Sequence, residues 1–107
     1  GFEIEYQADT ADQIASAIKA RASMKTNSSA LIVANPVKNQ MDKKLHDSIL
    51  ASGLASAEKE GITGKAVTPF LLEHFHTASD GDSLRVNIEI IKSNSALAAD
   101  IAVALNK

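Results

Sequence analysis

Residues 30–34 read ALIVA, and the prediction of the fold begins with this stretch. All of its residues are apolar, a pattern typical of a central parallel strand that helices cover on both faces. Asn35 and Pro36 follow at once, and proline ends a strand because it has no N–H to donate to the sheet. The sequence therefore predicts an interior strand over Ala30–Ala34.

The region before this stretch shows first a strand pattern and then a helix pattern. Phe2–Tyr6 alternates apolar and polar residues, as an edge strand does. Thr10 and Gln13 form a capping-box pair that predicts a helix running to about Met24. With further helices after residue 34, the order becomes β-α-β-α-α-α. We therefore predict the fold class as α/β, the C-terminal part of an α/β/α layered fold with a helical tail.

The second half of the chain shows helical spacing of its apolar residues. A helix is expected from about Asp42 to Glu60, with Gly61 as its C-terminal stop. Thr68 and Pro69 predict the start of the next helix, because threonine caps a free N–H and proline suits the first helical position. That helix should run to about His76.

The last helix is expected over residues 84–105, after the polar DGDS stretch of residues 80–83 has ended the previous helix and supplied caps. Three small polar residues at 93–95 favour a break within it, because their helix propensity is poor. Two strands alone would leave both sheet edges open, so further strands are expected upstream or in another chain.

The composition is that of one ordinary globular domain, or of part of one. The chain has 107 residues, of which 45% are apolar and 22% charged, and its net charge is −2. This balance gives no basic patch for a nucleic-acid polymer or an anionic membrane surface. The absence of cysteine fits a reducing cytoplasm, and we see neither a membrane span nor a signal peptide. The missing initiator Met before Gly1 indicates a mature terminus or a piece of a longer protein.

Four polar residues stand out, each with a structural and a functional interpretation. Asn35 either turns the chain before proline or contacts a ligand at the end of the strand. Lys65 follows Gly64 ahead of a helix, as a solvated turn lysine or as a contact for an anion. Asn87 and Asn94 either satisfy buried backbone groups or face a ligand pocket, because they share a helical stripe with three apolar residues, Ile90, Leu97 and Ile101.

The sequence shows no complete catalytic or metal-binding motif. His74 and His76 are two residues apart on a predicted helix, so they point in nearly opposite directions and cannot share an ion there. His46, among lysines and aspartates, is expected at the surface. We therefore predict no catalytic residue and no metal ligand within this chain.

Three stretches together resemble a known enzyme family. They are LIVANPV at residues 31–37, AEKEGITGKAVTPFLL at 57–72 and NIEIIKSNSALAADIAVAL at 87–105. In this order they are similar to the C-terminal third of the pseudouridine-5′-phosphate glycosidases, also called the indigoidine-synthase-A-like family. On this basis residues 1–107 would be the C-terminal portion of a single glycosidase domain whose catalytic N-terminal portion is absent from the chain.

The resemblance implies a reaction and its requirements. The family reversibly cleaves the C–C glycosidic bond of pseudouridine 5′-phosphate to ribose 5-phosphate and uracil, through a lysine Schiff base. That lysine, the acidic residues and the divalent metal, usually manganese, would lie outside this chain, and the enzyme would be a cytoplasmic homotrimer. Within the chain, Asn94 matches an asparagine of the family and is therefore the implied substrate-binding residue.

Two departures and two alternatives accompany the resemblance. Ser93 and Ser95 stand where relatives often have Asn and Ala, and the HFHTASDGDS stretch is longer than the usual turn. The competing function is a non-catalytic α/β interaction or regulatory module that retains the scaffold. The complete protein could also be fused to a sugar kinase.

Overall fold

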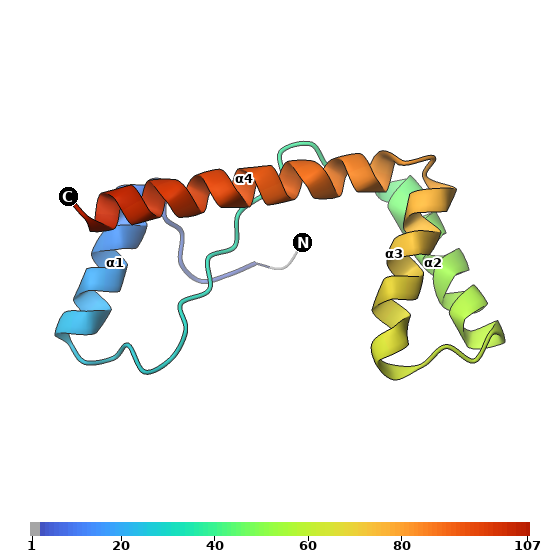
Figure 1. Cartoon of the computed structure of the whole chain (residues 1–107), viewed down its shortest axis with the longest axis horizontal. Helices are drawn as coiled ribbons and strands as arrows, with labels where there is room; N and C mark the ends of the chain where they lie inside the picture. The colour runs from blue at the N-terminus through green and yellow to red at the C-terminus, as the bar shows by residue number, and fades with distance from the viewer. Residues whose placement is uncertain (1–2) are drawn as a thin grey trace. The chain divides into compact units, whose positions relative to one another are not determined.

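The computed structural model describes residues 3–107, and the elements in this range are helices (Figure 1). They are α1 (Ala11–Ser23), α2 (Lys43–Lys59), the short 3-10 helix η1 (Gly64–Ala66), α3 (Val67–Ala78) and α4 (Asp82–Leu105). Two compact units divide the chain. The first unit comprises the residues through Asn35 together with Lys92–Lys107, and the second unit comprises Pro36–Ile91, so the division falls within α4.

The predicted α/β fold class is wrong, because residues 3–107 contain no strand. Ala30–Ala34 has no regular secondary structure and is solvent-exposed, with 88% of Ile32 accessible. A strand is stabilised by bonding to a neighbouring strand, and the described part of the chain offers none. Residues 3–6 of the predicted edge strand are likewise irregular and exposed, whereas Phe2 lies outside the described residues.

In the second unit, α2 begins and ends where the sequence predicts. Asp42 is its N-cap, and a carboxylate oxygen of this residue accepts a hydrogen bond of 2.9 Å from the backbone N–H of Leu45. Glu60 is the C-cap, and Gly61 follows with a φ of 68°, in the left-handed region. This confirms both the helix and its glycine stop.

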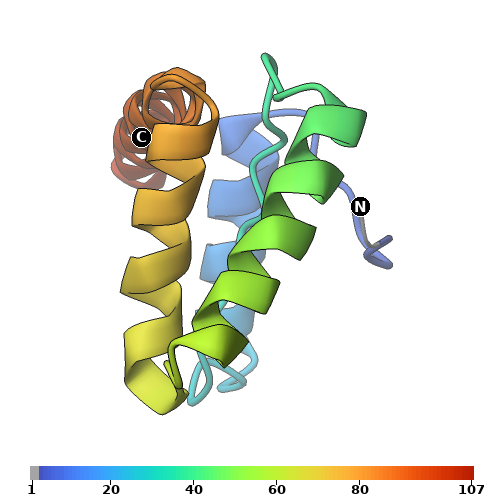
Figure 2. The same ribbon diagram turned by 90° about the vertical axis from the view of Figure 1, so that its right-hand side faces the viewer.

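α2 and α3 lie side by side, and Gly53 of α2 faces side chains of α3 (Figure 2). A Cβ atom at this position would lie 2.9 Å from Cδ2 of Leu71 and 3.0 Å from Cδ2 of His74. Glycine therefore leaves room on α2 for the side chains of Leu71 and His74. Ile49 and Ala57, one turn to either side of this point, are 4% exposed each and supply the apolar core of α2.

α3 begins slightly earlier than predicted. Its first residue is Val67, its N-cap is Ala66, and no side chain caps its free N–H groups. Thr68 is thus already inside the helix, so the predicted threonine cap is wrong. Pro69 lies within the first turn, where its missing N–H costs no intrahelical hydrogen bond. The 3-10 helix η1 leads directly into α3 and takes over the role of a separate cap.

The start of α4 is capped by Ser79, which directly precedes the DGDS stretch of residues 80–83. The hydroxyl of Ser79 accepts a hydrogen bond of 3.0 Å from the backbone N–H of Ser83 and donates one of 2.6 Å to the carbonyl oxygen of Phe75. One side chain therefore closes α3 and opens α4. The helix then continues through residues 93–95 without a break, contrary to the prediction. No helix within residues 3–107 is long and apolar enough to cross a membrane.

The helix α1 in the first unit confirms the predicted capping pair, with one difference. Oγ1 of Thr10 accepts a hydrogen bond of 3.2 Å from the backbone N–H of Gln13. In return, Oε1 of Gln13 accepts one of 2.6 Å from the N–H of Asp9, the residue before the cap. Both bonds satisfy donors at the helix start, as a capping box does.

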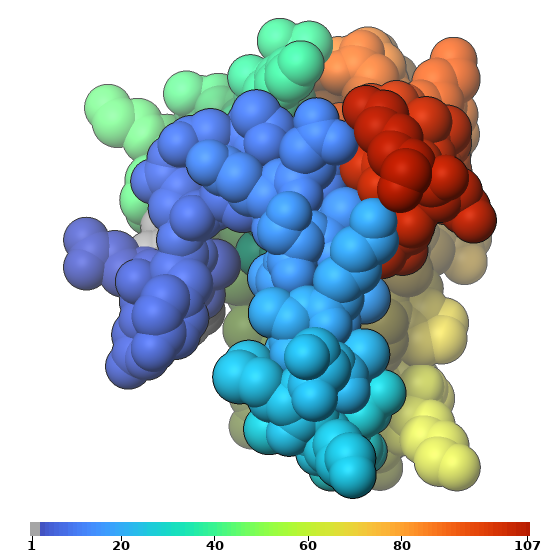
Figure 3. All heavy atoms as spheres, turned by 90° about the vertical axis from the view of Figure 1, so that its left-hand side faces the viewer, coloured from blue at the N-terminus to red at the C-terminus, as the bar shows by residue number. Residues whose placement is uncertain are grey.

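The core of the first unit is small. Ile14 and Ala15 of α1 and Ala104 of α4 are its buried apolar residues. Nζ of Lys107 and Oδ1 of Asp12 form an exposed ion pair of 3.3 Å between the C-terminal end of α4 and the first turn of α1, which lie beside each other (Figure 3). α1 and the end of α4 thus belong to one unit.

The helices α1, α2 and α3 end with the same backbone geometry. The residue after each C-cap is left-handed, with φ of 58° at Lys25, 68° at Gly61 and 52° at Asp80. The following N–H bonds back to a carbonyl five residues earlier in each case: Thr26 to Arg21 at 2.9 Å, Ile62 to Ala57 at 2.8 Å and Gly81 to His76 at 2.9 Å. This is the Schellman motif, and only α2 places glycine at the left-handed position.

Candidate functional site

The candidate site is a hydrogen-bonded cluster in the first unit that includes Asn94. Asn35 lies in the irregular segment between α1 and α2, directly after residues 30–34, and its Nδ2 donates two hydrogen bonds. One, of 3.0 Å, goes to Oγ of Ser93. The other, also 3.0 Å, goes to Oδ1 of Asn94. The structure thus brings together two of the asparagines that the sequence singled out separately, 59 residues apart in the chain.

The cluster has two half-buried members and one that is accessible to solvent. Asn35 and Ser93 are half-buried, whereas Asn94 is exposed. Because α4 is unbroken at residues 93–95, Asn94 is carried on a regular helix and not on a loop. An exposed amide on a rigid helix, held by a partner from another segment, is suited to offering a hydrogen bond to a small molecule.

Asn87 does not take part in this cluster. It lies on α4 within the second unit and is exposed. Ile90, Leu97 and Ile101, the apolar members of the predicted stripe, are half-buried. The stripe is therefore only partly covered, and of its two asparagines Asn94 is the one that lies in the cluster.

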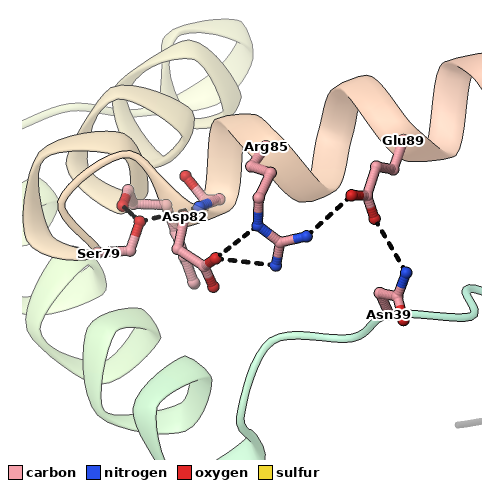
Figure 4. Close-up of polar contacts among 7 residues, drawn as sticks. Asn39, Ser79, Asp82, Arg85 and Glu89 are labelled. Carbon is pink, nitrogen blue, oxygen red and sulfur yellow. Dashed lines mark hydrogen bonds and ion pairs between the residues drawn. The ribbon is translucent and has the colours of Figure 1, made fainter.

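A second polar cluster, which the sequence reasoning missed, lies in the second unit (Figure 4). Arg85 pairs with Asp82 at 2.9 Å and with Glu89 at 3.0 Å, both on α4. Nδ2 of Asn39 donates to the second carboxylate oxygen of Glu89 at 3.4 Å. The pKa of Arg85 is raised, mainly by the hydrogen bond and the negative charge of Asp82 and to a smaller extent by those of Glu89. Asp82 and Glu89 lie three residues before and four residues after Arg85, a spacing that predicts ion pairs on a helix.

This cluster is better explained by structure than by chemistry. Arg85 faces two carboxylates, those of Asp82 and Glu89, so the cluster has a net charge of −1 and no free cation to attract an anionic substrate. Its members are half-exposed, and such pairs contribute little to stability individually. The bond from Asn39 ties the segment before α2 to α4, and we assign the cluster to that role.

Ser52 and His74 form a hydroxyl–imidazole contact that joins α2 and α3. Oγ of Ser52 and Nε2 of His74 are 2.8 Å apart. The hydroxyl is also 2.9 Å from the carbonyl oxygen of Ile49, so its single proton goes to one of these two neighbours, and the tautomer of His74 sets which. The contact links the two helices.

His46 lies against an aromatic ring, and Lys65 is solvent-exposed. The ring of His46 is half-exposed and lies 5.1 Å, centroid to centroid, from that of Phe75. Lys65 is exposed, and the φ of 60° at Gly64 explains why glycine precedes it. Within residues 3–107, no group of three His, Cys, Asp or Glu side chains is placed to hold a metal ion.

Comparison with known proteins identifies the family. Residues 1–104 match the family described as Indigoidine synthase A like protein. The chain belongs to the indigoidine synthase A-like family. Among curated relatives, the pseudouridine-5′-phosphate glycosidase of Salinispora tropica is 51% identical over 97% of the chain, and that of Geobacillus kaustophilus is 38% identical over 98%. The one from Clostridium botulinum is 36% identical over the whole chain.

This member of the indigoidine synthase A-like family spans about a third of the length of those relatives, between 33% and 35%. The predicted family is thereby confirmed. The Asn35, Ser93 and Asn94 cluster lies inside the matched region. It is also the only polar arrangement described above that contains a residue whose role the resemblance implies.

Proposed function

We propose that the complete protein is a pseudouridine-5′-phosphate glycosidase. The observation that carries this proposal is the match of three relatives of that name over at least 97% of the chain. The reaction would break the bond between C1′ of the ribose and C5 of the base with uptake of water. Its products are ribose 5-phosphate and uracil, and the step is reversible.

The reacting groups would lie in the remainder of the complete protein. These are the lysine that forms the Schiff base, the carboxylates that transfer protons, and the ligands of a divalent cation such as manganese. Residues 3–107 supply no cluster that fits such a cation, so no step of the reaction is assigned to a metal here. We further infer a homotrimer that acts in the cytoplasm.

The contribution of this chain would be substrate binding through Asn94. Its Oδ1 accepts a hydrogen bond from Asn35, and its Nδ2 makes none with another residue of the described chain. That N–H group can therefore donate to a substrate oxygen. A uracil carbonyl, a ribose hydroxyl and the phosphate all offer such an acceptor.

The activity is tested by incubating the complete protein with pseudouridine 5′-phosphate and measuring uracil and ribose 5-phosphate. We expect turnover by the complete protein and none by the 107-residue chain alone, because binding without the reacting groups does not lower the barrier. Absence of turnover by the complete protein, with its metal supplied, would contradict the proposal and favour an interaction module instead.

The role of Asn94 is tested by Asn94→Ala in the complete protein. Loss of a hydrogen bond to a buried substrate group should lower kcat/KM by about 10- to 100-fold. Asn106→Ala is the matched control, because Asn106 is an exposed amide just beyond α4 that bonds only to the carbonyl oxygen of Ala102. Unchanged kcat/KM with a lowered Tm for Asn94→Ala would refute the substrate role.

A further inference from the structure

We infer that Asn35 is a positioning residue, which holds the amide of Asn94 in the one orientation that presents its N–H group to the substrate. This inference rests on the proposed function and adds a second residue to the same site. It replaces the two roles considered from the sequence, a turn before Pro36 and a direct ligand contact.

An asparagine amide has two different ends. Turning it by 180° exchanges its oxygen, which only accepts, with its nitrogen, which only donates. An exposed asparagine on a helix can adopt either orientation. Asn94 is exposed, so its own helix does not decide between them.

The contact with Asn35 selects the orientation of the Asn94 amide. Its Nδ2 is a donor, and it lies 3.0 Å from Oδ1 of Asn94. If the Asn94 amide turned over, two N–H groups would face each other and the bond would be lost. The observed orientation therefore leaves Nδ2 of Asn94 as the group that is available, and the site is expected to bind an acceptor oxygen.

Asn35 has two restraints of its own. Its Nδ2 also donates to Oγ of Ser93, 3.0 Å away, so both of its protons are in use in this arrangement. Pro36 follows it directly and restricts its backbone to extended conformations. A half-buried side chain with both protons committed and a restricted backbone is well suited to hold a neighbour in place.

The test compares Asn35→Asp, Asn35→Ala and Asn94→Ala with the double variant Asn35→Ala/Asn94→Ala, all in the complete enzyme. Asn35→Asp keeps size and shape but has no proton to donate to Asn94, so we expect kcat/KM to fall by about 3- to 10-fold with an unchanged Tm. Asn35→Ala should give a similar loss. The double variant should be within about twofold of Asn94→Ala alone, because Asn35 acts through Asn94.

Asn39→Ala serves as the matched control. Asn39 also lies in the segment between α1 and α2 and also donates to a side chain of α4, but its partner is Glu89. We expect its kcat/KM to be unchanged.

The results distinguish failure of the positioning role of Asn35 from failure of substrate binding by Asn94. Full activity of Asn35→Asp, or losses that multiply in the double variant, would overturn the positioning role while leaving substrate binding by Asn94 intact. Full activity of Asn94→Ala would overturn both. If Asn35→Ala does not fold, the isosteric Asn35→Asp variant still decides the question.

Discussion

The α2–α3 pair and residues 30–34 are both rich in apolar side chains, yet they differ in what covers those side chains. In the pair, Ile49 is 4% exposed beside the close approach at Gly53. In the other region Ile32 is 88% exposed, and no hydrogen bond joins the backbone of residues 30–34 to another backbone group in the described chain. The same residue type is thus part of a core in one region and solvated in the other.

The difference shows what an apolar pattern can and cannot predict. A helix satisfies its own backbone and needs only one covered face, so α2 requires a single neighbour nearby in sequence. A strand needs backbone partners as well as cover, and both come from distant residues. An apolar run such as residues 30–34 therefore predicts neither burial nor a strand unless the partner that covers it is also present.

Hydrogen exchange of the 107-residue chain should show the largest contrast. Amides of Ile32 and Val33 should exchange at rates close to those of an unstructured chain. Amides inside α2, near Ile49 and Gly53, should be slower by about 100-fold or more, because they open only with the helix pair. Protection at Ile32 equal to that in α2 would show that this segment has a backbone partner.

The next largest effect is expected from substituting one isoleucine in each region and comparing the loss of stability. Ile49→Ala should lower the free energy of unfolding of the chain by about 2–5 kcal/mol, since it leaves a cavity in the α2–α3 contact. Ile32→Ala should change it by less than about 0.5 kcal/mol, because the side chain is already solvated. Urea denaturation of both variants measures the difference, and equal losses would remove the distinction between the regions.

A smaller effect is expected from overpacking the helix pair. Gly53→Val should cost about 1–3 kcal/mol, because even the Cβ would lie 2.9 Å from Leu71 and 3.0 Å from His74. Ala55→Val, at an exposed position of the same helix, should cost only the difference in helix propensity, at most about 0.7 kcal/mol. A Gly53→Val variant with the stability of Ala55→Val would show that α2 and α3 can move apart freely.

Local signals predicted most of the helical architecture. Thr10 with Gln13, Asp42 and Gly61 marked helix ends correctly, because each acts on backbone groups within a few residues. The start of α3 was placed too late, since a 3-10 turn and not a threonine side chain begins it. The break at residues 93–95 did not appear, because poor propensity over a few residues is too weak to interrupt a long cooperative helix.

The candidate site was predicted only in part. The family resemblance points to Asn94 and the end of the predicted strand points to Asn35, but nothing in the sequence pairs them across 59 residues. The poor helix propensity of Ser93 predicts a break in the helix, whereas the residue accepts a hydrogen bond from Asn35. Contacts of this kind depend on how distant segments pack, which a single sequence does not contain.

The left-handed residues that follow α1 and α3 have a consequence for how this sequence can change. A side chain in that conformation costs about 1–2 kcal/mol, and glycine there gives back about 0.5–1 kcal/mol through the greater freedom of the unfolded chain. Lys25 and Asp80 therefore stand where glycine would be at least as stable, as α2 already illustrates with Gly61. In evolutionary terms, a substitution to glycine at either helix end is available to compensate for a destabilising substitution elsewhere in the chain.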